Sequence, residues 1–121
     1  MKFTRELAGT LTIQSVTSRS ITINGEAYGQ SIALTPDELF TNWDPKPVAD
    51  LMDADFETLL QRSPEILLLG TGSKNVFPPR ELIFAFARRG VGLECMDTAA
   101  AARTFNVLAT EGRQVAAVLY L

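Results

Sequence analysis

Apolar and polar residues alternate along the first part of the chain, from Thr10 to Thr35. In two short runs of this segment the apolar side chains recur at every second position, which is the period of a strand with one buried face. Ser18-Arg19 and Asn24-Gly25 lie where turns are expected, and Asn-Gly is the favoured pair of a two-residue hairpin turn. With a third strand predicted from Ser31 to Leu34, this half predicts an antiparallel β meander.

The middle of the chain is rich in turn-forming residues. Prolines and acidic residues interrupt the pattern from Thr35 to Pro47, although a strand between Leu39 and Trp43 is compatible with it. Asp53 or Asp55 could begin a short helix after this segment. Three apolar side chains would share one face of that helix: Phe56, Leu59 and Leu60.

The second half alternates between strand and helix patterns. The nearly continuous apolar run from Glu65 to Leu69 predicts a strand that is covered on both faces. Pro79 and Gly90 then bracket a predicted helix over residues 80–89, because proline suits a helix start and glycine a helix end.

A second strand and helix follow. Residues 91–95 predict a strand, and Asp97 or Thr98 caps a helix that runs to about Thr110. Residues 114–121 alternate again as a final strand. Two successive strand–helix–strand units predict three parallel strands joined by right-handed crossovers, so the fold class is α/β, with a C-terminal βαβαβ unit.

Length and composition favour one globular domain over residues 1–121. The chain has 121 residues, which leaves no room for two independent cores, and 46% of them are hydrophobic. Its formal charge of −3 gives no electrostatic signature of nucleic-acid binding, and it disfavours anionic membranes. No apolar run approaches the length of an integral membrane segment. The segment Met1–Glu6 is not followed by a secretory apolar stretch, so a cytoplasmic location is expected.

The residues that carry most enzyme chemistry are scarce. The chain has no histidine, the commonest metal ligand and the usual partner of a serine or cysteine nucleophile. Cys95 is its single cysteine, which leaves no cysteine cluster for zinc, and we expect it to be buried and inert. We therefore predict no catalytic residues, no metal and no cofactor. An enzyme built here would depend on carboxylates, lysine, tyrosine or a borrowed cofactor.

Several motifs of the second half resemble those of a known family. They are Gly70-Thr71-Gly72 after an apolar strand, the helix start Pro78–Leu82, the stretch Glu94–Thr98, the helical stretch Ala102–Leu108 and Glu111-Gly112-Arg113. On these residues the chain resembles the small Mth938-like family of unknown function, which includes mitochondrial respiratory complex I assembly factor 3 and the adipogenesis-associated Mth938-domain protein.

The resemblance implies a three-layer domain, with the N-terminal meander packed with the C-terminal βαβαβ unit. It also implies protein–protein binding, as in some eukaryotic members, and no agreed catalysis. The chain has no targeting extension like that of the mitochondrial members, so we do not expect a mitochondrial location. The function predicted is a non-catalytic protein-binding or assembly-type domain with an unidentified protein partner. A homodimer is compatible with that role.

One loop has the context of a ligand site. It follows a strand and precedes a helix, where open α/β sheets bind ligands, and it contains Gly70, Thr71, Gly72, Ser73 and Lys74. With Arg80 and Asp97 it could bind a small anion or nucleotide, as a non-enzymatic binding protein or an unorthodox enzyme. It matches neither a dinucleotide fingerprint nor a Walker loop, and Pro78 and Pro79 lack the N–H groups that such a site uses. A tight structural turn is the alternative.

A partner surface could involve four residues: Phe77, Phe84, Arg103 and Asn106. Phe84 lies opposite Leu82 and Phe86 on the helical wheel, so it is predicted either to face a partner or to belong to a helix buried on both sides. Arg103 could recognise a partner carboxylate or remain solvated. Asn106 falls on the polar side of its helix and needs a neighbouring loop or a partner to bind.

Overall fold

The N-terminal strands form a small antiparallel sheet in the computed structural model, which describes residues 10–121; the expectation for Met1–Glu6 lies outside them. Strands β2 (Ile13–Val16), β3 (Ile21–Ile23) and β4 (Glu26–Tyr28) pair in the order β2-β3-β4. Asn24 and Gly25 have φ of 49° and 88°, the left-handed conformation of a type I′ hairpin turn. The predicted turn is confirmed.

The third strand of this meander differs from the prediction. It is β4, whereas β5 (Ile32–Leu34) leaves the meander and pairs antiparallel with the last strand of the chain. All three residues of β5 are buried, but two of the three in β4 are exposed. The fully apolar segment therefore belongs to a sheet covered on both faces, and the half-polar segment forms the edge of the meander.

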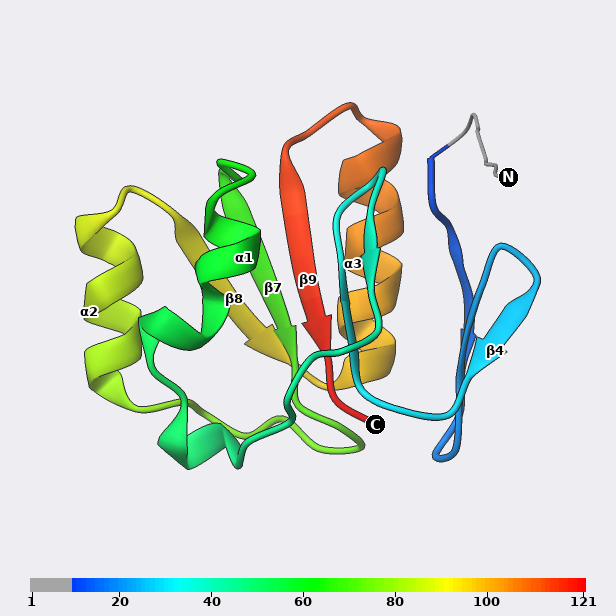
Figure 1. Ribbon diagram of the computed structural model, residues 1–121, viewed down its shortest axis with the longest axis horizontal. Helices are drawn as coiled ribbons and strands as arrows, with labels where there is room; N and C mark the ends of the chain where they lie inside the picture. The colour runs from blue at the N-terminus through cyan, green and yellow to red at the C-terminus, as the bar shows by residue number, and fades with distance from the viewer. Residues whose placement is uncertain (1–9) are drawn as a thin grey trace.

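The larger sheet has five strands among the described residues (Figure 1). Its order is β6-β5-β9-β7-β8, where β6 is Leu39–Phe40, β7 is Ile66–Gly70, β8 is Gly92–Met96 and β9 is Val115–Leu119. β7 pairs in parallel with both β8 and β9, which confirms the three predicted parallel strands. β9 joins the two halves of the chain, since it also pairs antiparallel with β5.

Helices cover both faces of this sheet. Helix α3 (Thr98–Thr110) packs on one face, together with the isoleucines of the meander, around Phe105 and Leu68. Helix α2 (Arg80–Arg88) packs on the other face, around Phe56 and Phe86. The short helices η2 (Asp53–Phe56) and α1 (Glu57–Leu60) share that second face, and η1 (Val48–Asp50) precedes them. The result is an α/β domain of three layers, as predicted.

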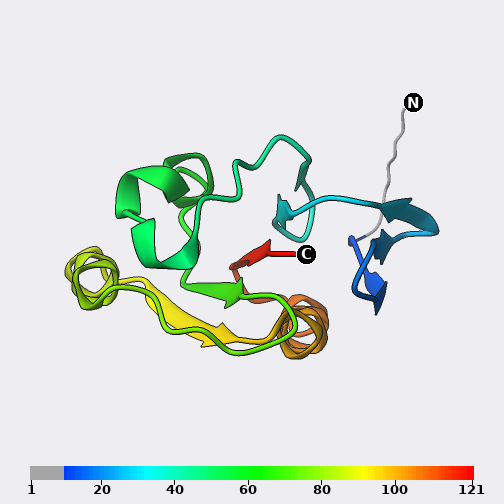
Figure 2. The same ribbon diagram turned by 90° about the horizontal axis from the view of Figure 1, so that it is seen from below.

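Helix α2 lies at one end of the long axis of the molecule, and the meander lies at the other end (Figures 1 and 2). Strand β8 is the edge strand nearest to α2 in both views. Among residues 10–121, no helix has the length and apolar character needed to span a bilayer.

Candidate functional site

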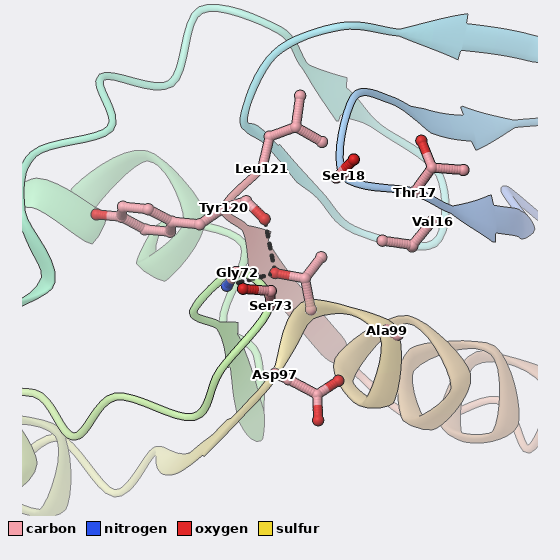
Figure 3. Close-up of a pocket in the computed structure, with 10 residues that line it drawn as sticks. Val16, Thr17, Ser18, Gly72, Ser73, Asp97, Ala99, Tyr120 and Leu121 are labelled. Atoms are coloured by element: carbon pink, nitrogen blue, oxygen red, sulfur yellow. Dashed lines mark hydrogen bonds between the residues drawn. The ribbon is translucent and has the colours of Figure 1, made fainter.

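The carboxyl ends of the three parallel strands meet beside the β2–β3 turn and enclose a pocket of about 370 Å³ (Figure 3). Its walls come from four segments that are distant in the sequence: residues 16–18, 72–73, 97–99 and 120–121. Figure 3 shows that the ring of Tyr120 points away from the β2–β3 turn, so its backbone contributes to the wall more than its phenol does. This is the edge at which open α/β sheets bind ligands.

The hydroxyl of Thr98 links two of the segments that line the pocket, the loop at Gly72 and the backbone at Tyr120. Its Oγ1 accepts from the N–H of Gly72 at 2.8 Å and donates to the carbonyl of Tyr120 at 2.6 Å. The N–H of Thr98 donates in turn to the carbonyl of Gly72 at 2.8 Å. Thr98 is buried, and a buried hydroxyl with both roles used is a structural link rather than a free ligand group.

Two glycines of the loop have structural reasons to be glycine. A Cβ on Gly70 would lie 2.9 Å from the Cα of Thr98 and 3.1 Å from the Cβ of Ala101, so its absence lets α3 approach β7 closely. Gly72 has φ of 97°, a conformation that side chains disfavour. The alternative of a tight structural turn thus accounts for both positions without a ligand.

The side chain of Thr71 holds the same loop in a turn through hydrogen bonds to its backbone. Its Oγ1 donates to the carbonyl of Lys74 at 2.6 Å and accepts from the N–H of Val76 at 2.9 Å. Such a local side-chain bond fixes a turn in place of regular structure. The side chains of Ser73 and Lys74 project from this turn as exposed groups.

The structure brings together three of the seven residues predicted for a ligand site. Gly72, Ser73 and Asp97 line the pocket, whereas the cationic residues Lys74 and Arg80 do not. Asp97 caps α3 as predicted, because its Oδ1 accepts from the N–H of Ala100 at 2.8 Å. The one charged lining side chain is thus a carboxylate, which repels anions. A ligand at this loop stays a prediction.

Sequence patterns missed the part of the wall that comes from the meander. Val16, Thr17 and Ser18 reach the pocket from a hairpin that lies more than fifty residues before Gly72 in the sequence. Hairpin residues carry a turn signal but no signal of what the turn will touch.

Helix α2 carries a second apolar face that points away from the core. Leu82 and Phe86 are buried, but Phe84 is 52% exposed and Ile83 is 42% exposed. Phe77, three residues before the helix, is 76% exposed. The structure therefore confirms the exposed alternative for Phe84, and it adds Ile83, which the helical wheel did not single out.

Arginines bracket the outward face of α2. Arg80, Phe84 and Arg88 are four residues apart, so they lie in one column along the helix. Ile83 and Ala87 form the adjacent column, and all five residues are exposed. We call these five residues, Arg80, Ile83, Phe84, Ala87 and Arg88, the outer α2 face.

The other two predicted interface residues lie elsewhere. Arg103 and Asn106 belong to α3, which covers the opposite face of the sheet from α2. Arg103 is exposed. The side-chain amide of Asn106 is engaged inside the chain, where it binds both backbone polar groups of Ile13. The four residues thus do not form one surface, and a partner role for each stays a prediction.

Two half-buried groups, the Cys95 thiol on β8 and the Tyr120 phenol just after β9, have a pKa above the ordinary value. Burial, reinforced by the nearby carboxylate of Glu94, raises the pKa of Cys95 to about 11. Burial also raises the pKa of Tyr120, and the neighbouring indole of Trp43 offsets this in part. The Tyr120 hydroxyl donates to the carbonyl of Lys46, and the Trp43 N–H makes no hydrogen bond of good geometry. Cys95 does not line the pocket, and Tyr120 borders it with its backbone more than with its phenol.

The chain therefore has the fold of an α/β domain of the Mth938-like class. Residues 13–120 match the model of the family described as "Protein of unknown function (DUF498/DUF598)". The chain belongs to this family, as its motifs predicted.

The chain is similar in sequence to proteins of known name from human and from Francisella tularensis. The chain is 33% identical over 117 residues to human NADH dehydrogenase [ubiquinone] 1 alpha subcomplex assembly factor 3, covering 95% of this chain and 63% of the relative. It is 32% identical over 72 residues to the 13 kDa major membrane protein of Francisella tularensis, covering 60% of this chain and 58% of the relative. The chain thus spans about three fifths of the length of these relatives.

Two solved structures share the fold over nearly all of the chain. A Xanthomonas campestris protein is 39% identical with a TM-score of 0.83, over 99% of this chain and 92% of that one. A Mth938-like domain of Bordetella pertussis is 28% identical with a TM-score of 0.73, over the same two shares.

Proposed function

We propose that this protein is a non-catalytic, protein-binding domain that assists the assembly of another protein or complex, and that it binds its partner with the outer α2 face. The observation that carries the proposal is the exposure of Phe84 and Ile83 on a helix whose opposite side already fills the core. Aromatic and arginine side chains are enriched among the residues that dominate binding energy at protein interfaces, and this face offers both.

The exposed apolar side chains of this face would contribute binding energy when a partner covers them. Complete burial of a Phe or Ile side chain contributes about 1.5–3 kcal/mol, and both side chains are partly buried already. Phe77 adds a third exposed apolar group next to the start of α2. Exposed apolar side chains that gather in one patch, rather than singly, mark interaction sites on folded domains.

The assembly role is proposed by similarity to the relatives named assembly factor 3. This chain covers 63% of the human relative, so the similarity concerns one shared domain. The role that we propose for that domain is to hold a partner protein without chemistry.

Partner capture with matched variants tests the proposal. The wild-type protein, Phe84→Ser and Val107→Ser are immobilised at equal density and exposed to extract of the native cell, and bound proteins are quantified. Val107 is the control, because it is 56% exposed on α3, away from α2. We expect one protein to be retained by wild type and by Val107→Ser and depleted at least tenfold with Phe84→Ser. Equal retention by all three variants would exclude the outer α2 face as the binding surface.

The cytoplasm is the location that we propose for this function. With one cysteine in its sequence, the domain needs no oxidising compartment for an intrachain disulfide. Cell fractionation tests this directly. Recovery of the protein with membranes after a high-salt wash, as the name of the Francisella relative suggests for that protein, would contradict it.

A further inference from the structure

The charge of the outer α2 face is opposite to that of the chain as a whole. The chain carries a formal charge of −3, yet Phe84 lies between Arg80 and Arg88 in one column of the helix. Given the proposed function, we infer the chemistry of the partner: it presents an amphipathic helix whose apolar stripe is flanked by carboxylates.

The two arginines of the column are available to a partner. Among the ion pairs formed by residues 10–121, none includes Arg80 or Arg88. Arg89, the next residue, is different, because its Nη2 lies 3.5 Å from Asp53 and 3.3 Å from Glu57. The chain thus neutralises Arg89 with its own carboxylates, whereas Arg80 and Arg88 have no carboxylate partner among the described residues.

One carboxylate borders this face and offsets part of its charge. Glu81, an exposed residue of α2, stands three residues before Phe84 and is its neighbour on the side away from Ile83. Two arginines and one glutamate leave the face with a net positive charge. Lys74 adds a further exposed cation in the loop before the helix. A partner stripe flanked by Asp or Glu would therefore gain attraction at both ends of Phe84, where guanidinium groups can bind carboxylates through two hydrogen bonds.

A helix suits this face better than an extended segment. An extended segment gains affinity largely from backbone hydrogen bonds to a sheet edge, and the backbone groups of α2 are used within the helix. The outer face offers side chains only, in columns spaced by four residues. Another helix can pack its own ridges between those columns. The stripe from Arg80 to Ala87 spans about 10 Å along the axis, or two turns of such a partner.

A second copy of this chain fits the face less well. A two-fold contact between two α2 helices brings each outer face against itself. Arg80 and Arg88 of one copy would then meet the same arginines of the other, and like charges in close contact oppose association. The same column that attracts an acidic helix thus acts against self-pairing.

Designed peptides test whether the outer α2 face prefers an acidic helix, and they do so without knowledge of the natural partner. Two fluorescent helical peptides of about 18 residues carry the same Leu/Phe stripe, flanked in one by Glu and in the other by Lys, both good helix formers. Binding is measured by fluorescence anisotropy for wild type, Phe84→Ser, and the double variant Arg80→Glu/Arg88→Glu. Val107→Ser serves again as the control.

We expect wild type and Val107→Ser to bind the Glu peptide at least tenfold more tightly than the Lys peptide, and the preference to weaken with added salt. The double variant should reverse the preference, a result that loss of folding would not produce. Phe84→Ser should weaken binding of both peptides.

Three outcomes overturn the inference. Equal binding of the two peptides that is lost with Phe84→Ser would reject the acidic partner and leave the proposed binding face standing. No saturable binding of the Glu peptide up to about 1 mM would reject the acidic helix as the occupant. A concentration-dependent dimer of wild type in light scattering, absent in Phe84→Ser, would make a second copy the occupant instead.

Discussion

The side chain of Asn106 on α3 holds the backbone of Ile13 on β2 with both of its polar atoms. Its Nδ2 donates to the carbonyl of Ile13 at 2.8 Å, and its Oδ1 accepts from the N–H of Ile13 at 3.0 Å. An amide side chain has the donor and acceptor pattern of a backbone group, so Asn106 takes the place of a neighbouring strand at this point of β2. Within the described part of the chain, Asn106 is the side chain that hydrogen-bonds the meander to α3.

We expect Asn106→Ala to lower the free energy of unfolding by about 1–2 kcal/mol, because two partly buried hydrogen bonds are lost. Arg103→Ala, on the exposed side of the same helix, is the control and should change stability by less than about 0.5 kcal/mol. Urea unfolding followed by circular dichroism measures both. If the two variants are equally stable, the Asn106–Ile13 pair contributes nothing to the fold.

Gly70→Ala should destabilise the domain by about 1–3 kcal/mol, since the added methyl group would crowd the backbone of Thr98 and the side chain of Ala101. Gly29→Ala is the matched control, as the nearest atom to its added Cβ would be the carbonyl oxygen of Arg19 at 3.7 Å. Thermal unfolding compares the two variants. A midpoint for Gly70→Ala equal to that of Gly29→Ala would show that α3 moves aside without cost.

The pair of Glu38 with Arg62 predicts a dependence of stability on pH. Arg62 donates to both carboxylate oxygens of Glu38, at 2.8 and 3.0 Å, and these bonds hold the pKa of Glu38 below its ordinary value of 4.5. Because the pKa is lower in the folded protein, the stabilisation is present above pH 4.5 and is lost as the pH falls through the folded-state pKa.

The stability difference between wild type and Glu38→Gln should therefore be larger at pH 7 than at pH 3 in urea unfolding. Both side chains are more than a third exposed, so the difference will be small and will shrink with salt. Glu111→Gln, at an exposed position that forms no ion pair with the described residues, controls for the general effect of one charge. A gap that is constant with pH would contradict the assignment.

Cys95 should be slow to alkylate in the folded protein. Its pKa of about 11, against an ordinary value of 9.0, leaves about a hundredfold less thiolate at pH 8 than a free cysteine has, and the thiolate is the reactive form. Iodoacetamide labelling followed by mass spectrometry should proceed at least that much more slowly in buffer than in urea. Equal rates would mean that the thiol is exposed and the raised pKa is absent.

Local signals in the sequence predicted local structure well. Asn24-Gly25 and Asp97 act on residues within a few positions of themselves, and the structure confirms both the turn and the cap. The parallel strands followed from the alternation of strand and helix, because chirality leaves few ways to connect them.

The errors lie where distant residues meet. The partner of Asn106 is 93 positions away, and no pattern around Asn106 encodes it. The exchange of β5 for β4 in the meander has the same cause, since β5 pairs with a strand more than eighty residues later. Lys74 and Arg80 do not line the pocket: the carbonyl of Lys74 is bound within the loop by the Thr71 hydroxyl, and Arg80 belongs to α2, which packs on the opposite face of the sheet from α3. A local sequence pattern predicts whether a segment is a strand, a helix or a turn, but it does not predict which distant residue will pair or hydrogen-bond with it.

The separation of the two sheets has a mechanical consequence. Among residues 10–121 no strand of the meander pairs with a strand of the five-stranded sheet. The meander is held by its apolar side chains and by Asn106, and the N–H of Leu11, just before β2, donates to the carbonyl of Pro36. Force applied to the meander would therefore break its side-chain contacts one after another. Strand β9 is hydrogen-bonded to a strand on each side, so pulling it out would require many backbone hydrogen bonds to break at once. The molecule thus has a weak seam beside α3, at the opposite end from α2.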